Sequence, residues 1–116
     1  MENKHGFEWS RHLMDFHLAG FAFHDGIEII EELKIGKPVT LVSEPDNPHD
    51  PQAVAIFYGQ HKIGYVPSAK NELLSKLLYF GYSDIFEARI QYVNMENHPE
   101  RQFRVVVRIK DGRKKI

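Results

Sequence analysis

The chain has 116 residues, of which 42% are hydrophobic, and this is enough for one domain with one core rather than for two independently stable units. It contains no cysteine, which excludes disulfide bonds, thiolate nucleophiles and zinc sites with sulfur ligands, and which suits a reducing compartment. The formal net charge of −1 does not predict a strongly basic nucleic-acid-binding protein.

Apolar residues do not form any stretch that approaches the roughly 20 residues of a membrane helix. Near the N-terminus, the longest apolar stretch is interrupted by Asp15 and His17, so it does not read as an export signal. We therefore expect a cytoplasmic protein.

Charge is unevenly distributed along the chain. Residues 101–116 carry seven lysines and arginines against one aspartate, a net charge of +6, which leaves −7 for residues 1–100. These cations can line a solvated edge strand and tail, where they discourage aggregation, or they can contribute to phosphate binding. The pattern leaves both interpretations open.

Three elements are predicted in the first half of the chain. Residues 1–14 lack clear periodicity, and residues 16–22 then read as a strand. A short helix is expected within residues 26–36, with Asp25 as its possible N-cap and Gly36 as the residue just beyond its end. Residues 39–42 form the next predicted strand.

The second half has a clearer pattern. Residues 53–58 and 62–66 flank Gly59 at a spacing that predicts a β-hairpin. Ser68 is the expected N-cap of a helix that ends at Gly81, and its leucines recur at helical spacing as a core face: Leu73, Leu74, Leu77 and Leu78. Residues 86–92 and 103–109 alternate between apolar and polar and predict an antiparallel hairpin.

Six strands joined largely by short turns, with two helices, favour a curled antiparallel sheet over parallel βαβ units. We predict a mainly β (α+β) fold that closes as a small six-stranded antiparallel barrel, although the pattern alone does not separate a barrel from a sandwich. The expected organisation is an N-terminal extension (1–15), one folded domain (16–110) and a basic C-terminal tail (111–116).

The most informative motif is the segment 44–50, which reads Glu-Pro-Asp-Asn-Pro-His-Asp. Its prolines restrict the backbone and its Asp and Asn side chains bond nearby amides, so the loop should be rigid. Together with Gly-Tyr-Val-Pro at residues 64–67, it resembles the HIRAN domain family, in the stand-alone form found in bacteria. The resemblance runs from about Phe16 to Ile109. It implies an OB-like β-barrel that captures the 3′ end of single-stranded DNA.

The resemblance implies roles for four residues of the two loops. Phe23 matches an aromatic side chain that stacks on the terminal base, and His49 occupies the position of a second stacking aromatic. Asn47 matches an asparagine that helps to position the DNA backbone. Asp50 matches an aspartate near the terminal 3′-hydroxyl, an interaction that a carboxylate can make by accepting a hydrogen bond. Purely structural roles remain open, because Phe23 can be a core residue and Asp50 can cap the turn.

Further matches concern phosphate binding. Tyr65 falls where related eukaryotic proteins carry a phosphate-contacting histidine, although it can instead pack across the hairpin. Two cations of the family pattern are absent here, where Ala22 and Ser68 stand. Lys70 can compensate in part, and the Ser68 hydroxyl with the first amides of its helix can hold a phosphate. The resemblance therefore implies weaker DNA binding, or its loss.

Enzymatic chemistry is not predicted. The seven histidines form no compact two-histidine metal motif, and the chain has neither a glycine-rich phosphate loop nor a nucleophile elbow. We expect no catalytic residue, metal or cofactor. The expected function is a single-stranded DNA-binding module that recognises 3′-hydroxyl ends in DNA repair or processing, acting with a separate DNA-processing enzyme. The alternative is a protein-interaction module that uses the same barrel surface.

Overall fold

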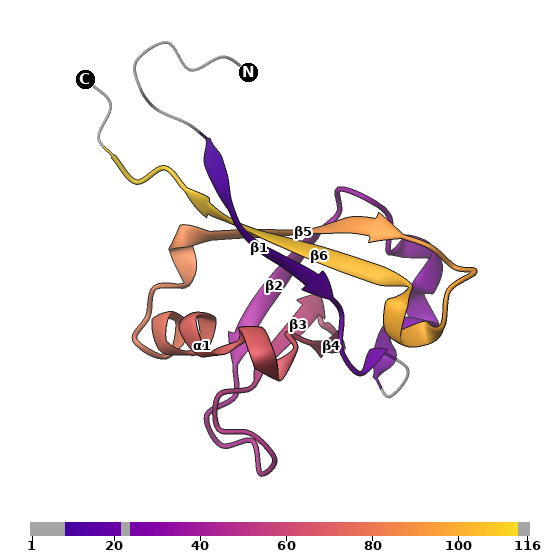
Figure 1. Ribbon diagram of the computed structural model, residues 1–116, viewed down its shortest axis with the longest axis horizontal. Helices are drawn as coiled ribbons and strands as arrows, with labels where there is room; N and C mark the ends of the chain where they lie inside the picture. The colour runs from indigo at the N-terminus through magenta and orange to yellow at the C-terminus, as the bar shows by residue number, and fades with distance from the viewer. Residues whose placement is uncertain (1–8, 22–23, 114–116) are drawn as a thin grey trace.

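The computed structural model describes residues 9–21 and 24–113, which form a six-stranded antiparallel sheet with helices packed beside it (Figure 1). The strands are β1 (Ser10–His17), β2 (Pro38–Ser43), β3 (Val54–Tyr58), β4 (His61–Tyr65), β5 (Phe86–Val93) and β6 (Phe103–Lys110). The α-helix is α1 (Glu72–Tyr79), and the 3-10 helices include η2 (Asp25–Glu32), η3 (Ser68–Lys70), η4 (Ser83–Ile85) and η5 (Pro99–Arg101). No helix in the described residues has the length and apolar character needed to cross a membrane.

The sheet has the strand order β1-β6-β5-β2-β3-β4, and it curls until its two edges meet. Just after β1, the backbone N–H of Ala19 donates to the Tyr65 carbonyl at 2.9 Å, and the Tyr65 N–H donates back to Ala19 at 2.9 Å. This bridge joins the two edges of the sheet at one pair of residues, and the sheet is not closed along its length. The fold is thus mainly β with an OB-like, barrel-like curvature, as predicted.

Gly64 allows this close approach. A Cβ atom built on Gly64 would lie 2.6 Å from the Ala19 carbonyl oxygen and 2.8 Å from Cγ of Leu18. Both distances are too short for any side chain, so a larger residue would force the two segments apart. The glycine of the Gly-Tyr-Val-Pro motif is therefore required by the packing of β4 against the segment that follows β1.

The core lies on the concave side of this sheet and follows the predicted alternation. Most of the predicted inward positions of the long hairpin are buried: Phe86, Ala88 and Ile90 on β5, and Phe103, Val105 and Val107 on β6. The prediction is wrong at Tyr92, which follows a register shift with β6 and is 45% exposed, and at Ile109 near the end of β6, which is 37% exposed. From α1, which packs against β2, Leu74 is fully buried and Leu77 and Leu78 are partly buried against the core. Leu73 is 48% exposed, so the predicted core face is wrong at that position.

Both predicted helices are present, but their bounds differ. The first ends at Glu32 with Leu33 as its C-cap, so Gly36 does not directly follow its end as predicted. It is a 3-10 helix in which His24 occupies the N-cap position, so Asp25 lies in the first turn and does not cap it. Ser68 opens the short η3, and α1 begins only after Asn71, so Ser68 is not its cap.

The end of α1 was predicted correctly. Gly81 has a φ of +92°, its N–H donates to Leu78, and the N–H of Tyr82 donates to Leu77. This is a Schellman ending, in which a glycine takes the left-handed conformation that other residues disfavour.

The first strand begins earlier than expected. β1 runs from Ser10 to His17 and pairs with β6, so it begins within the residues that lack clear periodicity and overlaps the predicted strand (16–22) at its end. Its register shifts between His12 and Met14, and both Leu13 and Met14 pack partly against the core. Because this bulge interrupts the period of two, the alternation that marks a half-buried strand is hidden.

Candidate nucleic-acid interface

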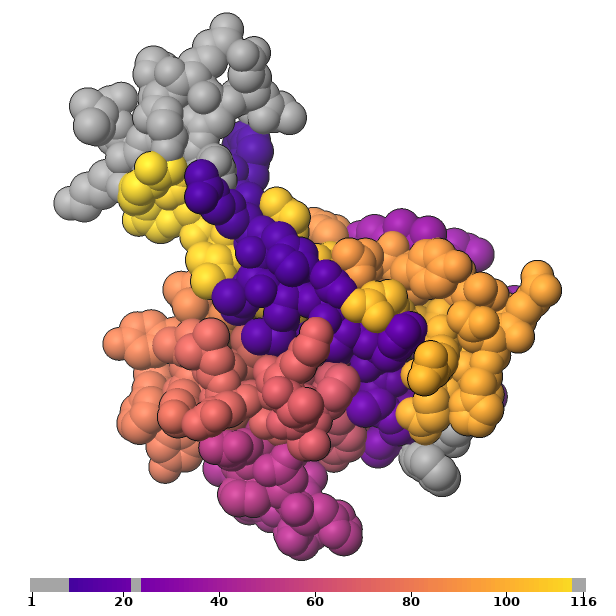
Figure 2. All heavy atoms as spheres, in the orientation of Figure 1, coloured from indigo at the N-terminus to yellow at the C-terminus, as the bar shows by residue number. Residues whose placement is uncertain are grey.

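The loop between β2 and β3 extends from the body of the protein, and its surface is well exposed (Figures 1 and 2). Asn47 organises it. Its Oδ1 accepts hydrogen bonds from the backbone N–H groups of His49 at 2.8 Å and Asp50 at 3.2 Å. Its Nδ2 donates to Oε1 of Glu44 at 3.0 Å. The asparagine thus bonds nearby backbone amides of the turn, as predicted from the sequence, and these bonds restrain the loop.

Asp50 connects this loop to the helical segment. Its Oδ1 accepts the backbone N–H of Gln52 at 2.8 Å, and its Oδ2 accepts Nδ2 of Asn71 at 2.9 Å. Asn71 is only 1% exposed, whereas Asp50 is half-buried. The structure therefore supports the turn-capping role of Asp50. A ligand role stays open, because an ionised carboxylate has about four lone-pair sites and two are used here.

Tyr65 belongs to a network between the loop and β4. Its hydroxyl donates to Glu44 Oε1 at 2.8 Å, and Lys62 Nζ donates to Glu44 Oε2 at 2.6 Å and to Tyr65 Oη at 3.1 Å. Neither Glu44 nor Lys62 was predicted as a site residue. Their separation by 18 positions carries no local signal, and they meet because β3 pairs with both β2 and β4.

The network stabilises both charged forms. Burial opposes ionisation of Glu44, but the bonds from Lys62, Tyr65 and Asn47 outweigh it and lower the pKa of the carboxyl group below 4.5. The bond to Glu44 raises the pKa of Lys62 above 10.5, against a smaller effect of burial. A carboxylate and an ammonium group therefore face each other at neutral pH.

The segment that follows β1 lies next to Tyr65. The His24 ring packs edge-on against the Tyr65 ring, with 5.3 Å between their centroids. Burial, followed by the charge of Lys62, lowers the pKa of His24 below 6.5. Phe23, the predicted stacking residue, lies outside the described residues, as does Ala22. Among the described residues of this segment, the aromatic side chain that packs against Tyr65 is therefore His24.

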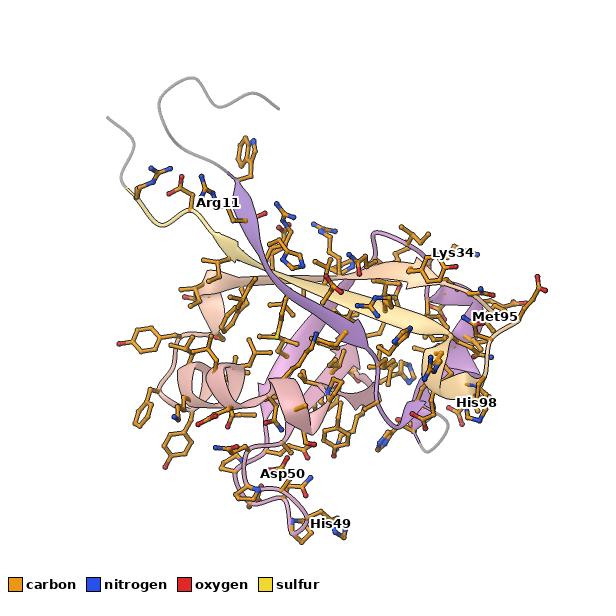
Figure 3. The ribbon with its side chains drawn as sticks, in the orientation of Figure 1. Arg11, Lys34, His49, Asp50, Met95 and His98 are labelled. Atoms are coloured by element: carbon orange, nitrogen blue, oxygen red, sulfur yellow. The ribbon has the colours of Figure 1, made fainter. Side chains whose placement is uncertain are left out.

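The other predicted residues are dispersed. Figure 3 shows His49 at the outer tip of the loop and Asp50 closer to the body. Ser68 is exposed at the start of η3, and α1 begins further along the chain, so the predicted phosphate role of Ser68 involves η3 rather than α1. Lys70 donates to the backbone carbonyl of Asp15 at 2.8 Å, which directs it toward β1. The structure therefore brings Asn47 and Tyr65 together through Glu44, and leaves Ser68 and Lys70 outside this network.

The arginines of β6 bind the neighbouring strand. Arg104 forms an ion pair with Asp15 and donates to Nδ1 of His17 at 3.1 Å. Arg108 donates from Nε to the Ser10 hydroxyl at 2.7 Å and from Nη2 to the Ser10 carbonyl at 2.9 Å. These contacts favour a structural role for Arg104 and Arg108, in which both side chains hold β1 against β6.

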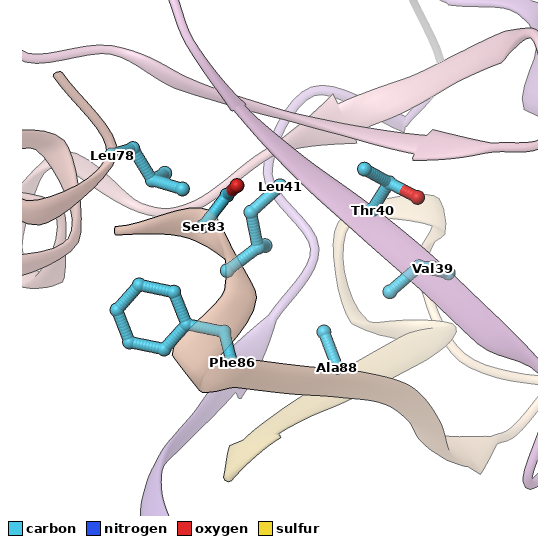
Figure 4. Close-up of a pocket in the computed structure, with 7 residues that line it drawn as sticks. All are labelled: Val39, Thr40, Leu41, Leu78, Ser83, Phe86 and Ala88. Carbon is cyan, nitrogen blue, oxygen red and sulfur yellow. The ribbon is translucent and has the colours of Figure 1, made fainter. Parts of the chain in front are cut away.

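A small cavity of about 140 Å³ lies between α1, β2 and β5 (Figure 4). Its lining combines apolar side chains with the hydroxyl groups of two residues and consists of Val39, Thr40, Leu41, Leu78, Ser83, Phe86 and Ala88. None of the predicted site residues contributes to it. The candidate interface is therefore the exposed surface formed by the β2–β3 loop, β4 and the segment after β1. Among the described residues, no three His, Asp or Glu side chains gather in a way that could hold a metal ion.

Two solved structures share this fold. A protein from Lactobacillus plantarum aligns with a TM-score of 0.73 and 19% identity, covering 88% of this chain and 96% of the other. The HIRAN domain of human HLTF aligns with a TM-score of 0.55 and 17% identity, covering 85% of this chain and 76% of the other. At these identities, the likeness concerns the fold.

Sequence comparison adds a relative and a family. The chain is 31% identical over 70 residues to a Fanconi-associated nuclease 1 homolog from Oryza sativa subsp. japonica. This match covers 57% of the chain but about 7% of the nuclease homolog, so the chain spans a small part of that protein. The family model of the HIRAN domain matches residues 12–110. Because this match covers most of the chain, from within β1 to the end of β6, the chain belongs to the HIRAN domain family.

Proposed function

We propose that the chain is a non-catalytic module that binds the 3′ end of single-stranded DNA. The observation that carries this proposal is the restrained β2–β3 loop, in which Asn47 holds Asp50 on an exposed surface. Asp50 retains lone pairs for a hydroxyl donor, and Asn47 retains one N–H of its amide for an acceptor such as a phosphate oxygen. A pre-organised pair of this kind suits a strand end, which presents both groups.

The setting of the relative supports a role in DNA processing. In the Oryza nuclease homolog, the matched segment is a small part of a much longer protein. We propose that this chain supplies DNA-end binding to a separate processing enzyme, in repair or a related pathway. On this proposal, the protein itself leaves labelled DNA intact during incubation with Mg²⁺.

The test is a titration of short fluorescent single strands at low salt. An acidic polymer of the same charge is the control, because general electrostatic attraction acts on the polymer and on the DNA strand alike. The proposal requires the single strand to bind more tightly than the polymer and more tightly than a blunt duplex of the same length. Equal affinity for the strand and the polymer would remove the DNA-binding proposal.

One observation favours recognition of a polypeptide by the same surface. Glu44, Asp46 and Asp50 give the loop three carboxylates, and Lys62 is the cation that contacts this group. Acidic surfaces attract basic peptides and repel phosphates. If a basic peptide binds and the single strand does not exceed the polymer control, the alternative replaces the DNA proposal.

A further inference from the structure

Lys62 lies on the candidate interface, and its contacts within the protein do not use all of its hydrogen-bond donors. Its Nζ is bonded to Glu44 and Tyr65, and it lies 5.1 Å from the centroid of the Tyr65 ring and 6.0 Å from that of Phe57. Its side chain is still 29% exposed. An ammonium group has three N–H donors, and two of them have these protein partners. The third donor is available to a ligand.

The negative charge of the β2–β3 loop indicates an electrostatic role for the ammonium group of Lys62. A DNA strand that places its end at Asp50 brings phosphates close to a loop whose own charge is negative. Each such phosphate is repelled unless a cation lies near its path. Lys70, the other nearby lysine in the sequence, is bonded to the backbone of β1. Lys62 therefore lies closest to the loop, in contact with Glu44 itself.

We propose that Lys62 binds a backbone phosphate near the 3′ end of the strand, and that Glu44 positions it for this contact. This inference rests on the proposed function. Glu44 holds Nζ over the Tyr65 ring, which leaves the remaining N–H directed away from the carboxylate. A pre-positioned lysine loses little side-chain freedom on binding, so the contact gains affinity. The Tyr65 hydroxyl donates its proton to Glu44 and accepts a hydrogen bond from Nζ, so it helps to hold the ammonium group in place.

The decisive measurement is the salt dependence of DNA affinity. Each phosphate neutralised on a single strand contributes about 0.7 to the slope of log K against log salt. Lys62→Gln should reduce the slope by about that amount and weaken binding about tenfold at low salt, the size expected for a hydrogen bond to a charged group. Lys62→Arg should keep most of the slope. Lys76→Gln is the matched control, because Lys76 also pairs with a glutamate but lies exposed on α1.

A purely structural role for Lys62 makes a different prediction. If Lys62 only fastened Glu44, then Glu44→Gln and Lys62→Gln would weaken binding alike and neither would change the slope. On our proposal, Glu44→Gln keeps the slope, because the lysine charge remains. The double variant Glu44→Gln/Lys62→Gln leaves no unpaired charge, so it should fold even if Lys62→Gln does not. Its slope should be about 0.7 smaller than that of Glu44→Gln.

The outcomes separate the two proposals. If the wild type binds single strands above the polymer control but the slope is the same in Glu44→Gln and the double variant, Lys62 does not bind phosphate and the DNA proposal stands. If the wild type does not exceed the polymer control, both proposals fall. A reduced slope in the double variant, with Lys76→Gln unchanged, supports the assignment of Lys62.

Discussion

The buried amide of Asn71 donates to the half-buried carboxylate of Asp50 at 2.9 Å, and this bond ties the β2–β3 loop to the start of α1. Asn71 therefore acts on the loop from the opposite side to Asn47. One asparagine shapes the turn from within, and the other fastens it to the body of the protein.

Asn71→Ala should lower the free energy of unfolding by about 1–3 kcal/mol, because it leaves buried polar groups without partners. Urea denaturation measures this change. The backbone amide of Gln52 should also exchange faster with deuterium, since Asp50 would lose one of its two anchors. Asn97→Ala, in an exposed turn, is the control. An Asn71→Ala protein as stable as this control would show that the bond contributes little.

A 3′-phosphate should weaken DNA binding about tenfold or more relative to a 3′-hydroxyl, because the strand loses a hydrogen bond to Asp50 and gains charge repulsion. Asp50→Asn should shrink this preference, since the charge is lost while an acceptor remains for the Gln52 amide. Titration of both DNA ends against both proteins, with circular dichroism to verify folding, measures the effect. Equal binding of the two ends by the wild type would contradict recognition of the hydroxyl group. A preference that persists in Asp50→Asn would assign it to other residues.

Replacing Arg104 and Arg108 together with glutamine should destabilise the protein and leave the salt slope of DNA binding unchanged. Both guanidinium groups already bind β1, through Asp15 and His17 in one case and Ser10 in the other. Urea denaturation and binding at several salt concentrations give the two quantities. A flatter salt slope in a folded double variant would instead assign these arginines to phosphate binding.

The pKa of His24 should lie below 6.5, because burial and the charge of Lys62 both disfavour protonation, against a smaller opposing effect of Asp25 and Glu44. The unfolded chain then takes up this proton at a higher pH than the folded protein. The free energy of unfolding should therefore fall as the pH drops below about 6.5.

An NMR titration of the His24 ring follows its pKa directly. Lys62→Gln should raise that pKa, because it removes a nearby positive charge. Lys76→Gln should leave it unchanged. Titration of His24 at or above 6.5 in the wild type would mean that the ring is better solvated than this packing indicates.

Gly64→Ala should cost about 1–3 kcal/mol of unfolding free energy, because its Cβ would lie 2.6 Å from the Ala19 carbonyl oxygen and push the two sheet edges apart. Gly112→Ala is the comparison, since a Cβ at Gly112 meets nothing within 4 Å. Thermal or urea denaturation measures both variants. Similar stabilities would show that the bridge between Ala19 and Tyr65 can move to accept a methyl group.

The sequence predicted the features that depend on residues close together in the chain. The turn formed by Asn47, the stop at Gly81 and the alternation of the long hairpin from Phe86 all arise from local chemistry. β1 was missed in part because its bulge breaks the alternation. The Glu44–Lys62 pair and the Asp50–Asn71 bond join residues far apart in the chain, so only the paired strands and the packed helix reveal them.

The pairing of β1 with β6 has a consequence for synthesis on the ribosome. The register places Ser10 opposite Lys110, so, among the strands that the structure describes, the first to be made pairs with the last. The nascent β1 must remain without its partner until almost all of the domain has emerged. During that interval its charged and imidazole side chains, at Arg11, His12, Asp15 and His17, keep an unpaired edge from joining the edges of other nascent chains.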